Sequence, residues 1–141
     1  MSPELEKKLI DKYPEIFTRK DETGESKVVS YGIDVGDGWY DIIDTACVNI
    51  MSHMEHHRGK RHLTPEEFEE TVQVKAAQVK EKFGGLRFYV DNHSEYVSGI
   101  LAMAESMSMR TCERCGNPGT QRKGGWIKTL CQTCDSGARK K

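Results

Sequence analysis

The sequence predicts an α+β fold, in which a small body of helices and an antiparallel hairpin carries a C-terminal four-cysteine zinc ribbon packed on it. Three observations predict this fold. Two Cys-x-x-Cys pairs, separated by fifteen residues, lie near the C-terminus, which is typical of a zinc ribbon. The glycine pair at 84–85 is flanked by alternating apolar and polar residues, as in a β-hairpin. Elsewhere, apolar residues recur at helical spacing.

Composition limits the class of protein. The chain has 141 residues, of which 30% are charged and 36% are hydrophobic, so we expect a soluble chain with one small domain and a zinc module. No segment approaches the length of about 20 apolar residues that a membrane span needs. The first residues lack the apolar stretch of a secretory signal. Four of the five cysteines lie in the two pairs, which favours bound metal in a reducing, cytoplasmic compartment over disulfides.

Charge is distributed unevenly along the chain. We predict a body over residues 1–109, a zinc ribbon over 110–137 and a disordered basic tail over 138–141. Residues 110–141 carry a net charge of +6 and the remainder carries −7. Zinc with four thiolates lowers the ribbon's charge by about two. A basic module on an acidic body favours contact with nucleic acid or with an acidic protein surface, although an ordinary solvated surface is the alternative.

The N-terminal third predicts one helix, one loop and one strand. Residues 3–17 have apolar side chains at helical spacing, with Ser2 as N-cap, and Pro14 is expected to end or bend this helix. Residues 18–27 are polar and predict a loop. Residues 28–35 predict a short strand.

A second helix is predicted over residues 40–56, after a turn at Gly36–Trp39. Its apolar stripe consists of Ile42, Ile43, Ala46, Cys47, Ile50, Met51 and Met54. We expect Cys47, in the middle of this stripe, to be a buried hydrophobic residue rather than a nucleophile. The helix end and the following loop hold His53, His56, His57 and His62. His53 and His57 share a helical face. No acidic residue or cysteine completes a known metal motif with them, so a polar helix end is the preferred interpretation.

Residues 64–78 begin with a helix start and then become ambiguous. Thr64, Pro65 and Glu67 form a capping box with proline at the first helical position. Residues 71–78 fit either a helical stripe or strand alternation. We favour a helix to about residue 70 followed by a strand, because a hairpin comes next.

The hairpin is predicted to turn at Gly84-Gly85, which pairs Phe83 with Leu86. One face then carries Val79, Phe83, Leu86, Phe88 and Val90, and the other carries Lys80, Lys82, Arg87 and Tyr89. Glu81 falls on the apolar face, where a carboxylate needs a partner or a position at the rim.

A third helix is predicted over residues 92–109, with Ser94 as a candidate cap. Its inner stripe consists of Tyr96, Val97, Ile100, Leu101, Ala104 and Met107. We expect Met103, Met107 and Met109 to belong to the core. Since almost no linker follows, we expect the ribbon to pack on the body.

The ribbon is predicted to bind one structural Zn²⁺. The four ligands are Cys112, Cys115, Cys131 and Cys134. Four thiolates complete a tetrahedral shell and leave no position for a substrate. A second hairpin candidate at 123–126 places Trp126 and Ile127 on the returning strand, where one of them is expected to cover the zinc.

Several local sequences carry a resemblance to a known family. They lie at 13–17, 36–44, 78–89, 104–116, Gly125-Trp126 and Leu130-Cys131. Together they resemble a family of small zinc-ribbon-containing proteins from bacteriophages and prophage-bearing bacteria, over most of the chain. The most specific part is Lys80-Glu-Lys-Phe-Gly-Gly-Leu-Arg-Phe-Tyr89. The resemblance implies a bacterial cytoplasm and an accessory, host-directed role, and it implies no catalytic residue.

The first candidate function is a zinc-stabilised binding module that contacts nucleic acid or a nucleic-acid-associated complex. The candidate ligand-binding residues are Lys80, Lys82, Arg87, Tyr89, Arg122, Lys123, Trp126 and Lys128. Basic residues beside aromatic rings suit phosphate contacts and base stacking. Alternatively, the charged residues of the hairpin solvate the outer face of a sheet.

Two other functions stay open. The chain is alternatively an inhibitor or adaptor that binds a host protein, such as a defence factor, or that sequesters a nucleotide ligand; the fold does not decide between these. A metal-dependent phosphodiesterase would use the acidic run Asp34, Asp37, Asp41 and Asp44 together with Glu81. Acids near a helix start are also favoured electrostatically, and the sequence contains no phosphate loop or zincin motif, so we predict no enzymatic activity.

Overall fold

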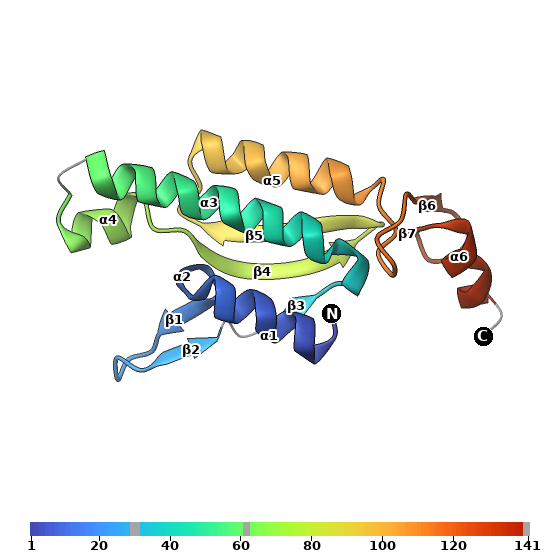
Figure 1. Cartoon of the computed structure of the whole chain (residues 1–141), viewed down its shortest axis with the longest axis horizontal. Coiled ribbons are helices and arrows are strands. Elements are labelled where there is room, and N and C mark those ends of the chain that lie inside the picture. Colours follow the sequence, from blue (N-terminus) through green and yellow to red (C-terminus); the bar gives the residue numbers. More distant parts are fainter. Residues whose placement is uncertain (29–31, 61–62, 140–141) are drawn as a thin grey trace.

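The body is a three-stranded sheet with helices packed on one face (Figure 1). The computed structural model describes residues 1–28, 32–60 and 63–139. The body elements are α1 (Pro3–Lys12), α2 (Pro14–Phe17), β1 (Thr18–Lys20), β2 (Ser26–Val28), β3 (Ile33–Asp34), the 3₁₀ helix η1 (Asp37–Trp39), α3 (Tyr40–Lys60), α4 (Pro65–Thr71), β4 (Lys75–Lys82), β5 (Gly85–Asp91) and α5 (Glu95–Ser108). The ribbon contains β6 (Thr120–Arg122), β7 (Lys128–Leu130) and α6 (Gln132–Arg139). These elements confirm the α+β fold with a C-terminal four-cysteine cluster.

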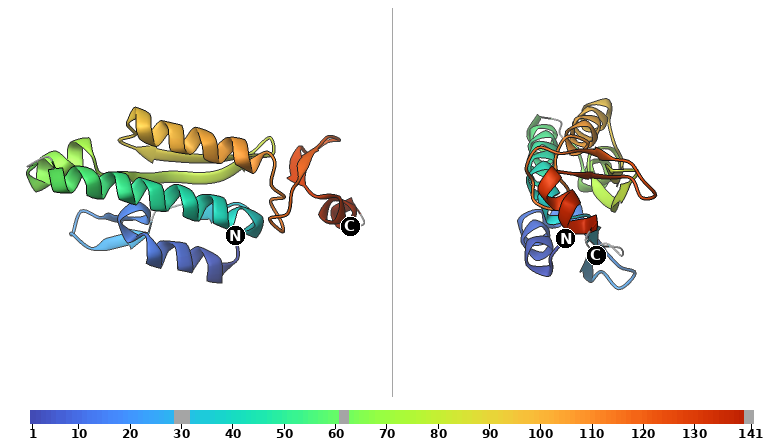
Figure 2. Two further views of the ribbon diagram at one scale, coloured as in Figure 1. Left: turned by 45° about the horizontal axis from the view of Figure 1, so that its top comes forward. Right: turned by 90° about the vertical axis from the view of Figure 1, so that its right-hand side faces the viewer.

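The sheet has the order β3-β4-β5, with β3 parallel to β4 and β4 antiparallel to β5. The helices α1, α3 and α5 lie on one side of it, and their apolar side chains meet those of the strands in one core. Trp39, Ile43 and Leu86 are buried there. Among the described elements, no helix covers the other face (Figure 2, right-hand view). No helix within these residues is long and apolar enough to cross a bilayer.

The N-terminal helix is broken where the sequence predicts it. Ser2 accepts a hydrogen bond from the backbone N–H of Leu5, and α1 ends at Lys12 before Pro14 starts α2. The predicted loop at 18–27 is wrong, because β1 and β2 form an antiparallel hairpin there. Its turn is stabilised by Asp21, whose carboxylate accepts backbone hydrogen bonds within the turn. The strand residues are largely exposed, so they lack the apolar alternation that identifies a strand.

Both predicted central helices form. α3 extends to Lys60, four residues beyond its predicted end, and Cys47 is buried as expected. Thr64 and Glu67 form the predicted capping box. α4 ends at Thr71 and β4 begins at Lys75, which confirms the helix-then-strand interpretation.

The limits of two predicted segments differ from those in the structure. Of the strand predicted over 28–35, only Ile33–Asp34 forms β3, while Val28 ends β2 and residues 29–31 lie outside the described residues. At the C-terminus α6 continues to Arg139. The predicted disordered tail therefore begins inside a helix, and residues 140–141 are outside the described part of the chain.

The central hairpin forms, but its turn lies one residue earlier than predicted. Lys82 pairs with Gly85, so Phe83 and Gly84 are the turn residues, with φ of 55° and 81°. Positive φ at both positions is the pattern of a type I′ turn. From Val79 to Lys82 and from Leu86 to Tyr89, each residue is paired two positions away from its predicted partner, which keeps the two faces of this part of the hairpin unchanged. Val90 pairs with Ala76, because the register shifts between Ala76 and Gln78. Phe83 leaves the apolar face and is 62% exposed.

α5 begins after Ser94, which accepts a hydrogen bond from the N–H of Val97. Val97 and Ala104 are buried, as predicted. Three other residues that were expected in the core are exposed: Tyr96, Met103 and Met107. The reason is that α5 packs on β5 and α3 with one side only, whereas these three residues lie at the α3/α5 junction that faces solvent.

Candidate metal centre

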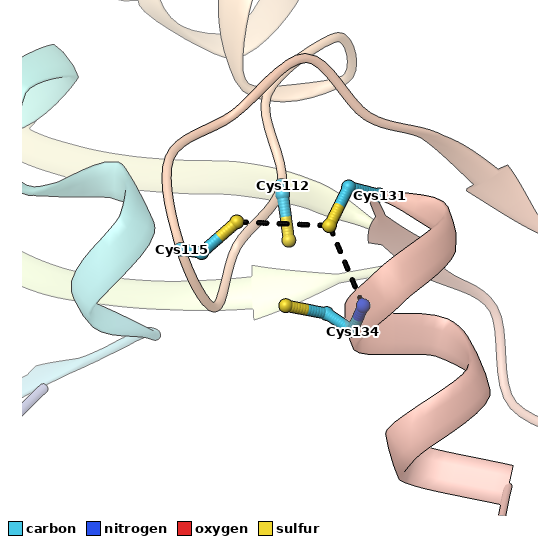
Figure 3. Close-up of side chains that lie close together, drawn as sticks. All are labelled: Cys112, Cys115, Cys131 and Cys134. Atoms are coloured by element: carbon cyan, nitrogen blue, oxygen red, sulfur yellow. Dashed lines mark hydrogen bonds between the residues drawn. The ribbon is translucent and has the colours of Figure 1, made fainter.

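Four cysteine sulfurs converge at the C-terminal end of the molecule (Figure 3). All four Sγ atoms lie within 4.8 Å of one another, and those of Cys115 and Cys131 are 3.6 Å apart. A tetrahedron with Zn–S bonds of about 2.3 Å has S···S edges of about 3.8 Å. The predicted ligand set is therefore arranged to hold one metal ion.

Two short segments present these sulfurs. In the first, Cys112 donates its N–H to the carbonyl of Asn117 at 2.7 Å. The chain turns at Gly116, whose φ is 83° and whose N–H donates to the carbonyl of Cys112. In the second, Cys131 precedes α6 and Cys134 lies in its first turn, with the Cys134 N–H directed at the Cys131 sulfur. Thiolates beside backbone N–H groups are favoured electrostatically.

Thiol ionisation also fits a bound cation. Burial alone would raise the pKa of Cys112, but backbone N–H groups of Cys131, Cys115 and Arg114 lower it to about 6. Contact with the Cys131 thiol raises the pKa of Cys134 to about 12. Four adjacent thiols cannot all ionise unless a positive charge lies among them, and a metal ion supplies that charge.

The first cysteine pair is docked on the turn at the start of α3. Gly38 donates its N–H to the carbonyl of Glu113 at 2.7 Å, and Gly36 donates to the Glu113 carboxylate at 3.0 Å. A Cβ at Gly38 would lie 2.1 Å from the carbonyl oxygen of Cys112, and one at Gly36 would lie 2.3 Å from that of Glu113. Only glycine allows this approach. The sequence indicated a turn here but not its contact with the ribbon.

The hairpin turn makes a second contact with the ribbon. The Thr129 hydroxyl donates to the carbonyl of Gly84 at 2.6 Å, and the Gln121 amide donates to that of Phe83 at 3.2 Å. Trp39 adds a hydrogen bond from its indole N–H to the carbonyl of Thr111. The ribbon is thus packed on the body, as predicted.

Lys128 lies between two carboxylates in this contact. Its Nζ is 2.8 Å from Glu81 Oε1 and 3.5 Å from Glu113 Oε1. Burial lowers the pKa of Lys128, but the two carboxylates raise it above its usual value, so the side chain stays charged. Glu81 therefore has the partner that its position on the apolar face requires, and Lys128 makes internal contacts rather than facing a ligand.

We expect Lys128→Met to lower the free energy of unfolding by about 2 kcal/mol, because two largely buried carboxylates would lose their shared cation. Urea denaturation measures this change. Lys123→Met, in the same ribbon, is the matched control, because within the described residues Lys123 forms no ion pair. Equal denaturation midpoints for the two variants would show that Lys128 adds nothing to stability.

The other predicted ligand-binding residues divide into two groups. Arg87 forms an ion pair with Glu105, and Arg122 donates to the carbonyl of Leu130 and lies 3.9 Å from Asp135. Both side chains therefore have internal partners. The residues that remain open to solvent or partly so are Lys80, Lys82, Tyr89, Lys123 and Trp126.

The expectation that Trp126 or Ile127 covers the metal site is wrong. Trp126 is 78% exposed, and Ile127 is exposed as well. Gly124 and Gly125 both have positive φ and carry the chain outward, so that β7 begins only at Lys128. Both residues thus lie in the connecting loop rather than on the returning strand.

The acidic run does not assemble into a site. Asp37 accepts a hydrogen bond from the N–H of Ser2, while Asp44 is bound by Lys12 and Tyr13. Burial and the bond to Asp44 raise the pKa of Tyr13 to about 12. Within the described residues, the four cysteines are the only group of three or more side chains placed to hold a metal.

The histidines share a helical face as predicted. The rings of His53 and His57 are 4.5 Å apart, and His53 also stacks on Tyr96. His56 lies beside His57, and His62 lies outside the described residues. The described histidines do not belong to a group of three metal ligands.

No family model, curated protein or solved structure matches the chain. The resemblance to phage and prophage proteins therefore stays a prediction.

Proposed function

We propose that this chain is a zinc-stabilised binding module for single-stranded nucleic acid. Zinc is the metal that fits four cysteines best, because structural zinc sites use such closed four-thiolate shells. The ion would hold the ribbon against the body and would take no part in chemistry. The proposed binding surface is the uncovered face of the sheet together with the hairpin turn and the ribbon loop.

Exposed aromatic rings beside lysines carry this proposal. Tyr89 is 47% exposed, and the Lys80 ammonium lies 5.8 Å from the centre of its ring. The Lys82 ammonium lies 5.5 Å from the ring centre of Phe83 at the turn. Bases stack on such rings with about 1–3 kcal/mol each, and the lysines contact phosphates. Phe83 was missing from the predicted site because the turn was placed one residue too late.

The charges in this region support the same surface. Within the described residues, Lys80 and Lys82 form no ion pair, so binding an anion would not require breaking one. The ribbon segment 110–141 is basic and remains so after zinc and four thiolates are counted. Its β6–β7 hairpin extends toward the side of the sheet opposite α3 (Figure 2, right-hand view).

The test is binding of a labelled single-stranded oligonucleotide of about ten nucleotides, followed by fluorescence anisotropy at several salt concentrations. We expect Lys80→Glu combined with Lys82→Glu to weaken binding at least about tenfold. The slope of log K against log salt should fall by about 1.4, because two phosphate contacts are lost. Tyr89→Ala and Trp126→Ala should weaken binding without changing the denaturation midpoint, because both rings are exposed.

The matched control is Lys20→Glu combined with Lys27→Glu. This pair makes the same charge change on exposed residues of the β1–β2 hairpin, at the far end of the molecule from the ribbon, and it removes the solvent-accessible ion pair of Lys27 with Asp21. It should retain most of the affinity. Equal losses of affinity in both double variants would show that net charge, rather than this surface, accounts for binding. Absence of binding by the unaltered zinc-loaded chain would refute the proposal.

A further inference from the structure

A groove of about 550 Å³ runs between α3 and α5. Its floor includes Ile42 and Ala46 from α3 and Ile100 from α5. Both helices that line it, α3 and α5, lie on the helical side of the sheet, opposite its uncovered face. This surface is therefore separate from the one proposed for nucleic acid.

The α5 side of the groove presents large apolar side chains to solvent. Tyr96 is 56% exposed, Met103 is 65% exposed and Met107 is 49% exposed. With Ile100 they occupy positions i, i+4, i+7 and i+11, which form a stripe about 17 Å long on one side of the helix. Methionine side chains adapt well to apolar partners. The length and shape of this stripe match about three turns of a docked helix.

Gly99 leaves the groove open on its α5 side. It lies in the middle of α5 and lines the groove, and its φ is in the ordinary helical range. Glycine there destabilises a helix by about 1 kcal/mol relative to alanine. No atom lies within 4 Å of a Cβ built at this position, so packing within the chain does not require glycine.

The charged residues of the groove indicate which charges its partner carries. Its lining has two charged residues, Asp41 and Glu95, and both are acidic. They lie at opposite ends, because α3 and α5 run in opposite directions and each residue is near the start of its helix (Figure 1). Neither forms an ion pair among the described residues. An occupant with cations at both ends would complement them.

From these features we infer that the α3/α5 groove docks an amphipathic α-helix of a protein partner. The helix has about three turns, an apolar stripe and Lys or Arg at both ends. Its apolar side chains cover Ile42, Ile100 and Met103, its backbone passes over Gly99, and its terminal cations meet Asp41 and Glu95. This inference does not depend on nucleic-acid binding by the sheet.

The test is selection from a displayed library of helical peptides on the zinc-loaded full chain, with affinities then measured by anisotropy. We expect enriched peptides to carry an apolar i, i+4, i+7 stripe flanked by basic residues. Gly99→Leu should weaken their binding at least tenfold, since the leucine side chain would fill the groove. Asp41→Asn combined with Glu95→Gln should weaken it several-fold and reduce its dependence on salt.

Gly137→Leu is the matched control, because this glycine of α6 also has no atom within 4 Å of a built Cβ and lies outside the groove. Neither leucine variant should lower the denaturation midpoint, so lost binding cannot be attributed to unfolding. Absence of enrichment, or peptides that bind Gly99→Leu as well as the unaltered chain, would overturn the inference. A concentration-dependent dimer that Gly99→Leu abolishes would overturn the partner assignment, because the groove would then bind a second copy.

Discussion

Replacement of Cys112 by Ser is expected to release the metal and to unfold the ribbon. Cys112 is buried within the four-sulfur cluster, and three remaining thiolates hold zinc far less tightly in a structural site. Since metal binding and folding are coupled in such modules, we expect the free energy of unfolding to fall by at least about 4 kcal/mol. Metal content, measured after purification in reducing buffer, should fall from about one equivalent to almost none.

Unfolding of the ribbon should also destabilise the neighbouring part of the body, because the ribbon forms hydrogen bonds with it. Gly38 donates to the Glu113 carbonyl and Gly84 accepts from the Thr129 hydroxyl. Hydrogen exchange should therefore accelerate at residues 110–139 and also at the amide of Gly38. A strong chelator applied to the unaltered chain should reproduce this pattern.

Cys47→Ala is the control, since this buried thiol lies in α3, outside the cluster. Burial raises the pKa of Cys47 far above its usual range, so the thiol stays neutral and does not bind metal. The variant should keep one equivalent of metal. A chain that holds no stoichiometric metal before any substitution would contradict the zinc assignment directly.

The four-cysteine cluster could be predicted because its signal is local. Two residues between cysteines let one turn present both sulfurs, and the helix starts at Ser2, Thr64 and Ser94 are likewise set by neighbouring residues. The hairpin turn was predicted one residue late, because Gly84-Gly85 is the favoured local turn, whereas Phe83-Gly84 places a phenylalanine at a φ of 55° in the left-handed region. The structure has the Phe83-Gly84 turn, in which the Gly84 carbonyl accepts from Thr129. That partner is forty-five residues away and leaves no local trace in the sequence.

Other features escaped prediction because they depend on which side of an element meets another. Tyr96 and Met107 fit a helical stripe, but α5 packs with one side only, so these side chains line an open groove. The β1–β2 hairpin has exposed strands and therefore no alternating pattern. The glycines at 36 and 38 indicate a turn, while their contact with the backbone of Cys112 and Glu113 appears only in three dimensions.

Replacement of Gly38 by Ala is expected to separate the ribbon from the body while leaving the metal bound. The added methyl group would lie 2.1 Å from the carbonyl oxygen of Cys112 and 2.5 Å from the amide nitrogen of Gly116. Both are backbone atoms, so no side-chain rotation relieves the contact. Overpacking of this kind costs about 3 kcal/mol or more in the free energy of unfolding. The four sulfurs keep their positions relative to one another, so metal content should stay near one equivalent.

Denaturation midpoints and hydrogen exchange measure this separation. The hydrogen bond from the Trp39 indole to the carbonyl of Thr111 should be lost together with protection of the Gly38 amide. Gly137→Ala is the control, because its methyl group meets nothing within 4 Å and should stabilise α6 by up to about 1 kcal/mol. If Gly38→Ala behaved like this control, the glycine contact would not hold the ribbon in place. Because Cys112→Ser removes both metal and docking and Gly38→Ala removes docking alone, the two variants together separate folding of the ribbon from its attachment to the body.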